Sequence, residues 1–359
     1  MTNKNKIKVL IIDDSALIRQ SISLLLKDSV FIDVVGTSYN PFDAIQKIQK
    51  LKPDVLLLDI QMPEMDGLTF LKKLMKQQPM PVIIFSSFVE EGSTNALKAL
   101  EYGAVEIIGK PKFTTSAELE KYKLKLIGAV QIASIANIKS KNNVLQQEII
   151  KEEIKTVSYK SPSISFDSNF IIAIGASTGG TEAIKRVLET VPEDFPPIVI
   201  TQHMPVGFTN SFANRLNQIC KITVKEAETN DILETGHAYI ARGDRQLIVK
   251  KVGEKHFLKL EDTPPVNRHK PSVDVLFNSV AKTYGKNSIG VILTGMGSDG
   301  AKGLKTMKET GAHTIAQDES SCVVFGMPKV AISIGGVDVV LPIYQITDYL
   351  IKTLSKNLI

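Results

Sequence analysis

The chain has 359 residues, of which 43% are hydrophobic and 23% are charged, a balance that excludes an intrinsically disordered protein. No apolar run approaches the roughly 20 residues that span a bilayer, so membrane insertion is not expected. The formal net charge of +5 is small, and Lys and Arg are scattered, so nucleic acid is not an expected partner. The length allows two domains, and the polar start MTNKNK lacks the apolar core of a signal peptide, so we expect a cytoplasmic protein.

Short apolar runs alternate with helical patterns in the first third of the chain. The runs are rich in Val, Ile and Leu, as in a parallel sheet that is covered on both faces. They predict strands over 7–12, 31–35, 55–58, 82–85 and 105–108, with helices that begin near Ala16, Pro41, Gly67, Thr94 and Ser116. The pattern predicts a doubly wound (βα)5 domain over residues 1–138.

Polar side chains follow the ends of these predicted strands. Asp13 and Asp14 follow the first strand, and Asp59 ends the third. Such carboxylates repel one another unless a cation neutralises them, and hard oxygen ligands suit Mg²⁺. Ser86 ends the fourth strand and Lys110 follows the fifth, which adds a hydroxyl and an ammonium that can hold a phosphoryl oxygen.

Three motifs in this region, DDSALIR, LLLDIQMPEMDG and GKP, closely resemble those of a response-regulator receiver domain. The resemblance implies that Asp59 is the phosphoacceptor and that Asp13 and Asp14 help it to bind Mg²⁺. It also implies that Ser86 and Lys110 contact the phosphoryl group. Receivers usually carry an aromatic switch residue at the position of Ile107, so phosphorylation is expected to be signalled without a ring rotation.

A polar, Ser-containing segment over residues 139–168 is predicted to be a linker. Strand and helix patterns resume after it, and they predict a second doubly wound parallel-sheet domain over residues 169–359, a three-layer α/β fold.

The stretch IIAIGASTGG predicts a buried strand followed by a tight turn at Ser177 and a helix near Thr181. It fits the G-x-S-x-G pattern of an exposed nucleophile. A phosphate-binding loop would need a lysine after Gly180, and a dinucleotide fingerprint would need glycine at Ser177. The remaining alternative is a serine that merely caps the helix.

His203 and Asp299 also lie just past predicted strands, over 198–200 and 288–293, so both can meet Ser177 at the carboxyl edge of one sheet. An imidazole can take the serine proton, and a buried carboxylate can orient the imidazole. Asp299 is alternatively a cap for a helix that begins at Ala301. The other histidines lack a similar setting and are expected to be structural or exposed: His237, His256, His269 and His313.

The Gly-rich loop before Asp299 offers a second element of such a site. The backbone N–H of Met296 can donate to an oxyanion, although its side chain is expected to pack in the loop.

Five motifs of the second domain closely resemble the catalytic domain of the chemotaxis protein-glutamate methylesterase/protein-glutamine glutaminase family: GASTGGTEAI, TQHMPVGFTNSFANRLN, RHKPSVDVLF, LTGMGSDGAKGL and IAQDESSCVVFGMPKVAI. The resemblance implies that Ser177 is the nucleophile, His203 the general base and acid, and Asp299 the orienting carboxylate. It implies demethylation of glutamate methyl esters on methyl-accepting chemotaxis receptors, with release of methanol, and deamidation of receptor glutamines. The implied phosphodonor is the chemotaxis histidine kinase, and hydrolysis is expected to need no cofactor. Family members commonly carry Pro and His at the positions of Arg242 and Gln246.

A receiver in front of a hydrolase suggests that the unphosphorylated receiver occludes the site and that phosphorylation favours an open arrangement. A different reading is a phosphorylation-controlled adaptor that binds receptor or kinase with little hydrolysis. A DNA-binding output is disfavoured because the second domain shows no basic recognition helix.

Overall fold

The computed structural model describes residues 6–62, 65–86, 94–111, 115–138, 166–167 and 169–355. The chain forms two compact units that divide between Lys139 and Ser140. Of the predicted linker, residues 139–165 and 168 lie outside the described residues. Across the described ranges, no helix combines the length and the apolar character that crossing a membrane requires.

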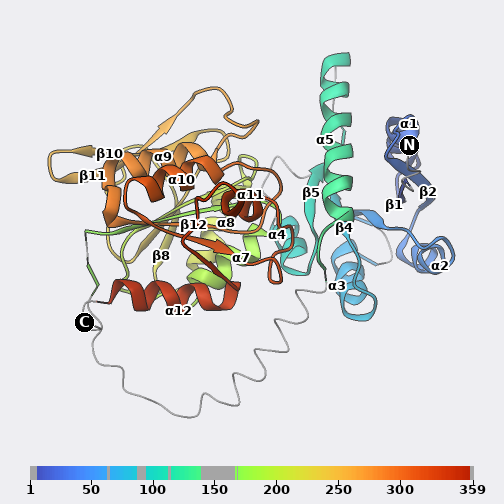
Figure 1. The fold of residues 1–359 in the computed structure, drawn as a ribbon. Coiled ribbons are helices and arrows are strands. Elements are labelled where there is room, and N and C mark those ends of the chain that lie inside the picture. Colours follow the sequence, from blue (N-terminus) through green and yellow to red (C-terminus); the bar gives the residue numbers. More distant parts are fainter. Residues whose placement is uncertain are drawn as a thin grey trace, which may run out of the picture. The chain divides into compact units, whose positions relative to one another are not determined.

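The N-terminal unit is a five-stranded parallel sheet with helices between its strands (Figure 1). Its elements are β1 (Ile7–Ile12), α1 (Ala16–Lys27), β2 (Ile32–Ser38), α2 (Pro41–Leu51), β3 (Val55–Asp59), α3 (Gly67–Gln77), β4 (Val82–Ser86), α4 (Thr94–Glu101), β5 (Glu106–Gly109) and α5 (Ser116–Ser134). The predicted (βα)5 order is confirmed, and all five helices begin at the predicted residues.

The second strand differs most from its predicted range, whereas the other strands of this unit agree with theirs to within one residue at each end. The apolar pattern predicts a strand over 31–35, but β2 continues to Ser38 because β1 pairs with it along its whole length, from Ile7 with Ile32 to Ile12 with Ser38. Gly36 and Thr37 therefore belong to the strand although neither is a strong strand former.

The strand order of this sheet is β2-β1-β3-β4-β5. The chain therefore places β2 on one side of β1 and then places β3, β4 and β5 on the other side. The carboxyl ends of β1 and β3 lie next to each other at this change of direction, where ligands bind in open α/β sheets.

The C-terminal unit contains a seven-stranded sheet in the order β14-β13-β12-β6-β7-β9-β8, in which every neighbouring pair is parallel. Its strands are β6 (Ile171–Ala176), β7 (Ile198–Gln202), β8 (Thr223–Glu226), β9 (His237–Ile240), β12 (Ser288–Ile292), β13 (His313–Gln317) and β14 (Val339–Leu341). The predicted parallel α/β fold is confirmed.

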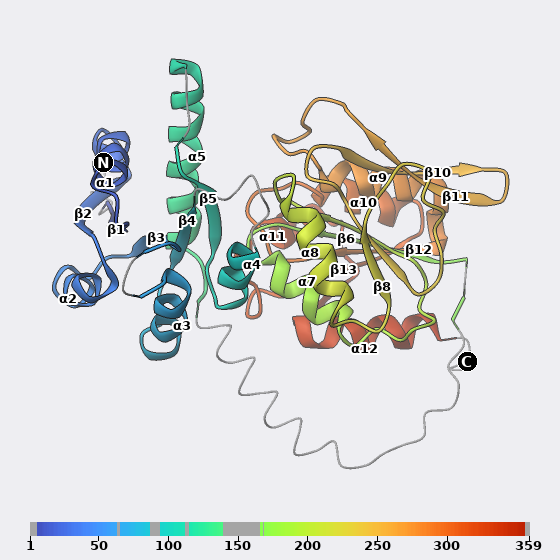
Figure 2. The ribbon, with the colours of Figure 1, turned by 180° about the vertical axis from the view of Figure 1, so that it is seen from behind.

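Helices cover both faces of this sheet, which gives three layers. Figure 1 shows α9 and α10 on one side and α12 on the other, and Figure 2 shows the same layers from behind. The helices are α7 (Gly180–Leu188), α8 (Phe208–Asn217), α9 (Val273–Tyr284), α10 (Ala301–Glu309), α11 (Met327–Ser333) and α12 (Ile343–Leu354), with a short 3-10 turn, η2 (Gly285–Asn287). Buried apolar residues of α9 and α10, including Phe277 and Leu304, form one core with the central strands.

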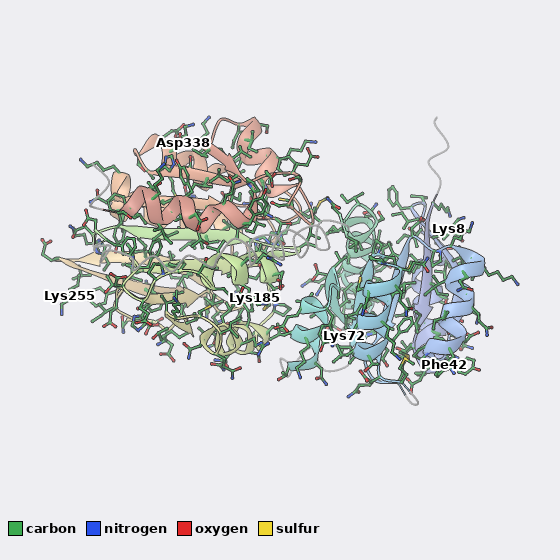
Figure 3. All side chains as sticks on the ribbon, turned by 90° about the horizontal axis from the view of Figure 1, so that it is seen from below. Lys8, Phe42, Lys72, Lys185, Lys255 and Asp338 are labelled. Carbon is green, nitrogen blue, oxygen red and sulfur yellow. The ribbon has the colours of Figure 1, made fainter. Side chains whose placement is uncertain are left out.

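An antiparallel hairpin, β10 (Gln246–Val252) and β11 (Lys255–Glu261), stands outside the parallel sheet and was not predicted. Its inner face packs on α9, where the amide of Val249 donates to Ser279 Oγ. Lys255 marks the outer end of the hairpin among the side chains in Figure 3. The inner end begins at Gln246, which is fully buried.

Candidate active site

The three predicted residues Ser177, His203 and Asp299 follow three strands that are neighbours in the sheet. Ser177 follows β6, His203 follows β7, and Asp299 lies in the loop between β12 and α10. From β6 the chain goes first to β7, its neighbour on one side, and later to β12, its neighbour on the other side. The residues therefore lie at the change of direction of the second sheet, the usual place for a site in this class of fold.

Ser177 stands in the turn between β6 and α7, and it does not cap the helix. The N-cap of α7 is Gly179, which has a φ of 78° and receives no side-chain hydrogen bond. A left-handed residue at this point favours glycine. The amide of Gly180 donates to the Ser177 carbonyl at 2.7 Å, so the turn is tight and the Ser177 hydroxyl is not committed to the helix.

Backbone and side-chain bonds hold the ends of β6 and β7 together. The His203 amide donates to the carbonyl of Ala176 at 3.1 Å. The side-chain amide of Gln202 donates to the Ser177 carbonyl at 3.0 Å and to the His203 carbonyl at 3.3 Å. Sequence reasoning missed this role of Gln202, although the residue lies in a quoted motif. The Gln202 side chain thus clamps the nucleophile turn to the backbone of His203.

Asp299 is buried and accepts hydrogen bonds on both carboxylate oxygens. His203 Nε2 donates to Oδ2 at 2.8 Å. The other donors are Asn267 Nδ2, Ser272 Oγ, and the amides of Val273 and Asp274. Burial alone would raise the pKa of Asp299, but the hydrogen bonds from His203, Asn267 and Ser272 outweigh it and hold the pKa below the ordinary range. The carboxylate is therefore ionised and acts only as an acceptor.

The contact with an ionised Asp299 fixes which nitrogen of His203 carries the proton. Because a carboxylate can only accept, Nε2 must be the protonated nitrogen of the neutral ring. Nδ1 then holds the lone pair, and this buried atom has no hydrogen-bond partner within the described ranges. A buried, unpaired imidazole nitrogen is poised to accept a proton.

His269 lies beside the predicted base, a position that the sequence pattern did not indicate. Its ring stacks on the ring of His203, with centroids 3.7 Å apart and planes inclined by 5°. Burial, together with the nearby His203 ring, lowers the pKa of His269 to about 4. The residue lies in a loop where Asn267 and Arg268 have φ values of 51° and 70°, so periodicity gave no signal for its position.

The stacking predicts a measurable pH dependence of stability. In the unfolded chain, His269 binds a proton near its ordinary pKa of 6.5, whereas in the folded chain it stays neutral down to about 4. Between these values the unfolded state binds more protons, so stability falls as pH falls through this window. We expect His269→Phe, which keeps a flat ring but cannot titrate, to show a smaller loss of Tm than the unmodified protein between about pH 7 and about pH 5. Parallel curves of Tm against pH for the two proteins would contradict this assignment.

The Gly-rich loop after β12 lies directly against Ser177. The Ser177 amide donates to the Thr294 carbonyl at 3.0 Å. A Cβ atom added to Gly295 would lie 2.7 Å from Ser177 Cβ, so only glycine permits this approach. The next residue, Met296, is 40% exposed. Gly295 thus brings the loop after β12 into contact with the nucleophile turn.

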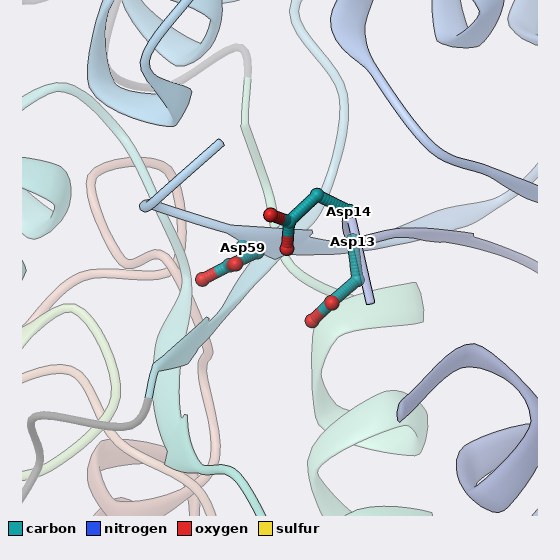
Figure 4. A group of neighbouring side chains, drawn as sticks. All are labelled: Asp13, Asp14 and Asp59. Atoms are coloured by element: carbon teal, nitrogen blue, oxygen red, sulfur yellow. The ribbon is translucent and has the colours of Figure 1, made fainter. Parts of the chain in front are cut away.

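In the N-terminal unit, the predicted carboxylates converge at the ends of β1 and β3. Oxygens of Asp13, Asp14 and Asp59 lie within 4.8 Å of one another (Figure 4). Lys110 Nζ lies 2.8 Å from Asp13 Oδ2 and 2.8 Å from Asp59 Oδ2. Burial and the nearby Asp13 carboxylate raise the pKa of Asp59 to about 6, although Lys110 opposes this shift. Ser86 is buried at the end of the neighbouring strand β4.

Comparison with known proteins shows which families the two units match. The family model for CheB methylesterase matches residues 172–350, and the model for the response regulator receiver domain matches residues 9–121. The chain is 48% identical over 350 residues to protein-glutamate methylesterase/protein-glutamine glutaminase 3 of Geobacter metallireducens, which covers 97% of this chain and 99% of that protein. The chain belongs to the protein-glutamate methylesterase/protein-glutamine glutaminase family.

Further relatives support this membership. The chain is 49% identical over 341 residues to the family member of Thiobacillus denitrificans, with 95% of each chain covered. The crystal structure of the Thermotoga maritima CheB methylesterase catalytic domain is 44% identical and matches with a TM-score of 0.51, covering 52% of this chain and 100% of that one.

Arg242 and Gln246, at which the resemblance indicates a departure from the common family pattern, have different settings. Arg242 is exposed, and its Nε atom lies 2.8 Å from Asp244 Oδ1. Gln246 is buried, so it does not contact substrate from solvent. In the receiver, Ile107 is half-buried in β5.

Proposed function

We propose that the second unit is a serine hydrolase that removes methyl groups from glutamate methyl esters of chemotaxis receptors and deamidates receptor glutamines. The observation that carries this proposal is the arrangement of His203, whose Nε2 is bonded to the ionised Asp299 while the buried Nδ1 is left unpaired. This arrangement supplies the base that a serine nucleophile needs at neutral pH.

In the first half-reaction, Ser177 Oγ attacks the γ-carbonyl carbon of the methylated glutamate, and its proton passes to His203 Nδ1. Asp299 stabilises the imidazolium that forms. We assign the oxyanion contact to the backbone N–H of Met296, because the residue before it, Gly295, lies against Ser177. The C–O bond to the methoxy group then breaks, and His203 returns the proton to the leaving methanol.

In the second half-reaction, His203 Nδ1 takes a proton from water as the water oxygen attacks the acyl-enzyme. The bond to Ser177 Oγ breaks and His203 returns its proton to Oγ. The carboxylic acid that forms releases the second water proton to solvent, which leaves a glutamate carboxylate. Because the leaving group of a glutamine side chain is ammonia, the same residues can carry out deamidation by the same two steps.

The described residues offer no hydrogen bond between Ser177 Oγ and His203 Nδ1, so the two side chains must come together before proton transfer. Such contacts are often long before substrate binds. The stacked ring of His269 and the Gln202 clamp limit the positions that His203 can take.

The receiver is proposed to control this activity through Asp59. A chemotaxis histidine kinase, or a small-molecule phosphodonor, would transfer a phosphoryl group to Asp59 Oδ while Lys110 and Ser86 contact its oxygens. The clustered oxygens of Asp13, Asp14 and Asp59 fit the hard oxygen ligands that Mg²⁺ prefers. Bound Mg²⁺ would neutralise charge on the phosphoryl oxygens.

Replacing Asp59 with Asn should remove control but not hydrolysis. An amide cannot form the acyl phosphate, so we expect the Asp59→Asn protein to release methanol at the same rate, within about twofold, with and without phosphodonor and Mg²⁺. The measurement is methanol release from methylated receptor membranes. Asp33→Asn, at an exposed position on β2, is the matched control and should keep the stimulation.

Stimulation that persists in Asp59→Asn would contradict the assignment of the phosphoacceptor. If the unphosphorylated receiver occludes the hydrolase, a protein without residues 1–140 should also release methanol faster than the unphosphorylated full chain.

A further inference from the structure

Gln246 is a fully buried polar side chain that the reaction steps above do not use. It begins β10, and its exposed fraction is 0%. Its Oε1 atom accepts a hydrogen bond from the Ser272 amide at 2.7 Å, and its Nε2 atom donates to the His269 carbonyl at 3.3 Å. One side chain therefore holds two points of the segment that precedes α9.

Each of these two points leads to a member of the acid–base pair. His269 stacks its ring on His203 at a centroid distance of 3.7 Å. Ser272 donates its hydroxyl to Asp299 Oδ1 at 2.7 Å, and the following amide, of Val273, donates to Asp299 Oδ2 at 2.7 Å. A shift of this segment would move the stacked ring and two donors of the carboxylate together.

We propose that Gln246 is a positioning residue that fixes the geometry of the His203–Asp299 pair through His269 and Ser272. The inference rests on the proposed function, since it concerns the same pair. The residue at position 246 must therefore carry one hydrogen-bond donor and one acceptor on a single side chain. Histidine can supply both from its two ring nitrogens, whereas methionine, of similar length, can supply neither.

Three variants test this demand. Gln246→Met removes both bonds with little change of length, and Gln246→His restores a donor and an acceptor. Thr347→Val is the matched control, since Thr347 is also buried and its hydroxyl donates to the Val187 carbonyl at 2.8 Å, on the side of α7 and α12. Thermal unfolding of each variant, followed by circular dichroism, reports the cost to the fold.

We expect Gln246→Met to lower kcat and to leave KM unchanged. Because a misplacement of about 1 Å can cost about 100-fold in rate, we expect kcat for methanol release to fall by about 10–100-fold in Gln246→Met, with KM unchanged within about twofold. Gln246→His should recover most of the rate. Thr347→Val should keep the rate even where its Tm falls.

An NMR measurement tests the same claim without any methylated receptor. The proton on His203 Nε2, bonded to Asp299, should give a low-field imidazole resonance that disappears in His203→Gln. We expect this resonance to shift or broaden in Gln246→Met and to be retained in Gln246→His and Thr347→Val. This NMR outcome does not depend on the substrate. A failure of the positioning role of Gln246 can therefore be told apart from a failure of the proposed function.

Two results would overturn the inference. One is a folded Gln246→Met protein with kcat within about twofold of the unmodified protein. The other is a folded Gln246→His protein as slow as Gln246→Met. If Gln246→Met does not fold, Gln246→Asn replaces it, because the shorter amide cannot reach both partners. Full activity and an unchanged imidazole resonance in Gln246→Asn would then overturn the inference.

Discussion

Ser177→Ala should reduce methanol release from methylated receptor membranes to the level of the blank. Removing the nucleophile of a serine hydrolase costs about 10⁶-fold in kcat, because the acyl-enzyme can no longer form. The substitution removes one oxygen from a half-buried turn, so we expect little change in Tm. The measurement is methanol release together with thermal unfolding.

Ser288→Ala is the control for this prediction. Ser288 is a buried serine at the amino-terminal end of β12, whereas the candidate site lies at the carboxyl ends of the strands. Its hydroxyl donates to the Gly285 carbonyl at 2.7 Å. This variant should keep its rate. Release from Ser177→Ala at a rate near that of the unmodified protein would rule out Ser177 as the nucleophile.

Asp299→Asn should lower kcat by about 10⁴-fold, because the wrong tautomer of His203 becomes favourable. The amide nitrogen of Asn can donate to Nε2, which would move the imidazole proton to Nδ1, the nitrogen that must accept the proton of Ser177. The amide also cannot accept on both sides, so donors such as Val273 N–H lose their partner. We expect an additional loss of about 2–4 kcal/mol in the free energy of unfolding.

The control for Asp299 is Asp338→Asn. Asp338 also accepts several hydrogen bonds, from Thr314 and Lys308, but it precedes β14 at the far edge of the sheet. It should lower Tm and leave kcat unchanged. Equal rates for Asp299→Asn and Asp338→Asn, after correction for folded protein, would show that Asp299 acts only through stability.

The sequence predicted the elements that local patterns encode. All five receiver helices begin at the predicted residues, since their starts carry local signals such as the Ser15 and Asn40 caps and the capping box at Thr115. The strand ends that carry Ser177 and His203 were also readable, because buried runs of Ile and Val stop at small or polar residues.

The parts that were not predicted depend on contacts between distant segments. The hairpin of β10 and β11 has a mixed pattern, since Lys250, Lys251 and Lys259 interrupt its apolar positions. His269 reaches His203 from a loop whose path depends on two left-handed residues and on Gln246. No spacing rule links residues 203, 246 and 269, so only the folded chain brings them together.

Methanol release by the purified full-length protein, with and without a small-molecule phosphodonor and Mg²⁺, tests the central claim most directly. Methylated receptor membranes are the substrate, and the Ser177→Ala protein provides the blank. We predict release that rises with phosphodonor and is absent in the variant. An absence of release under both conditions, in protein whose Asp59 is shown to be phosphorylated, would contradict the claim and favour an adaptor that binds receptor or kinase without hydrolysis.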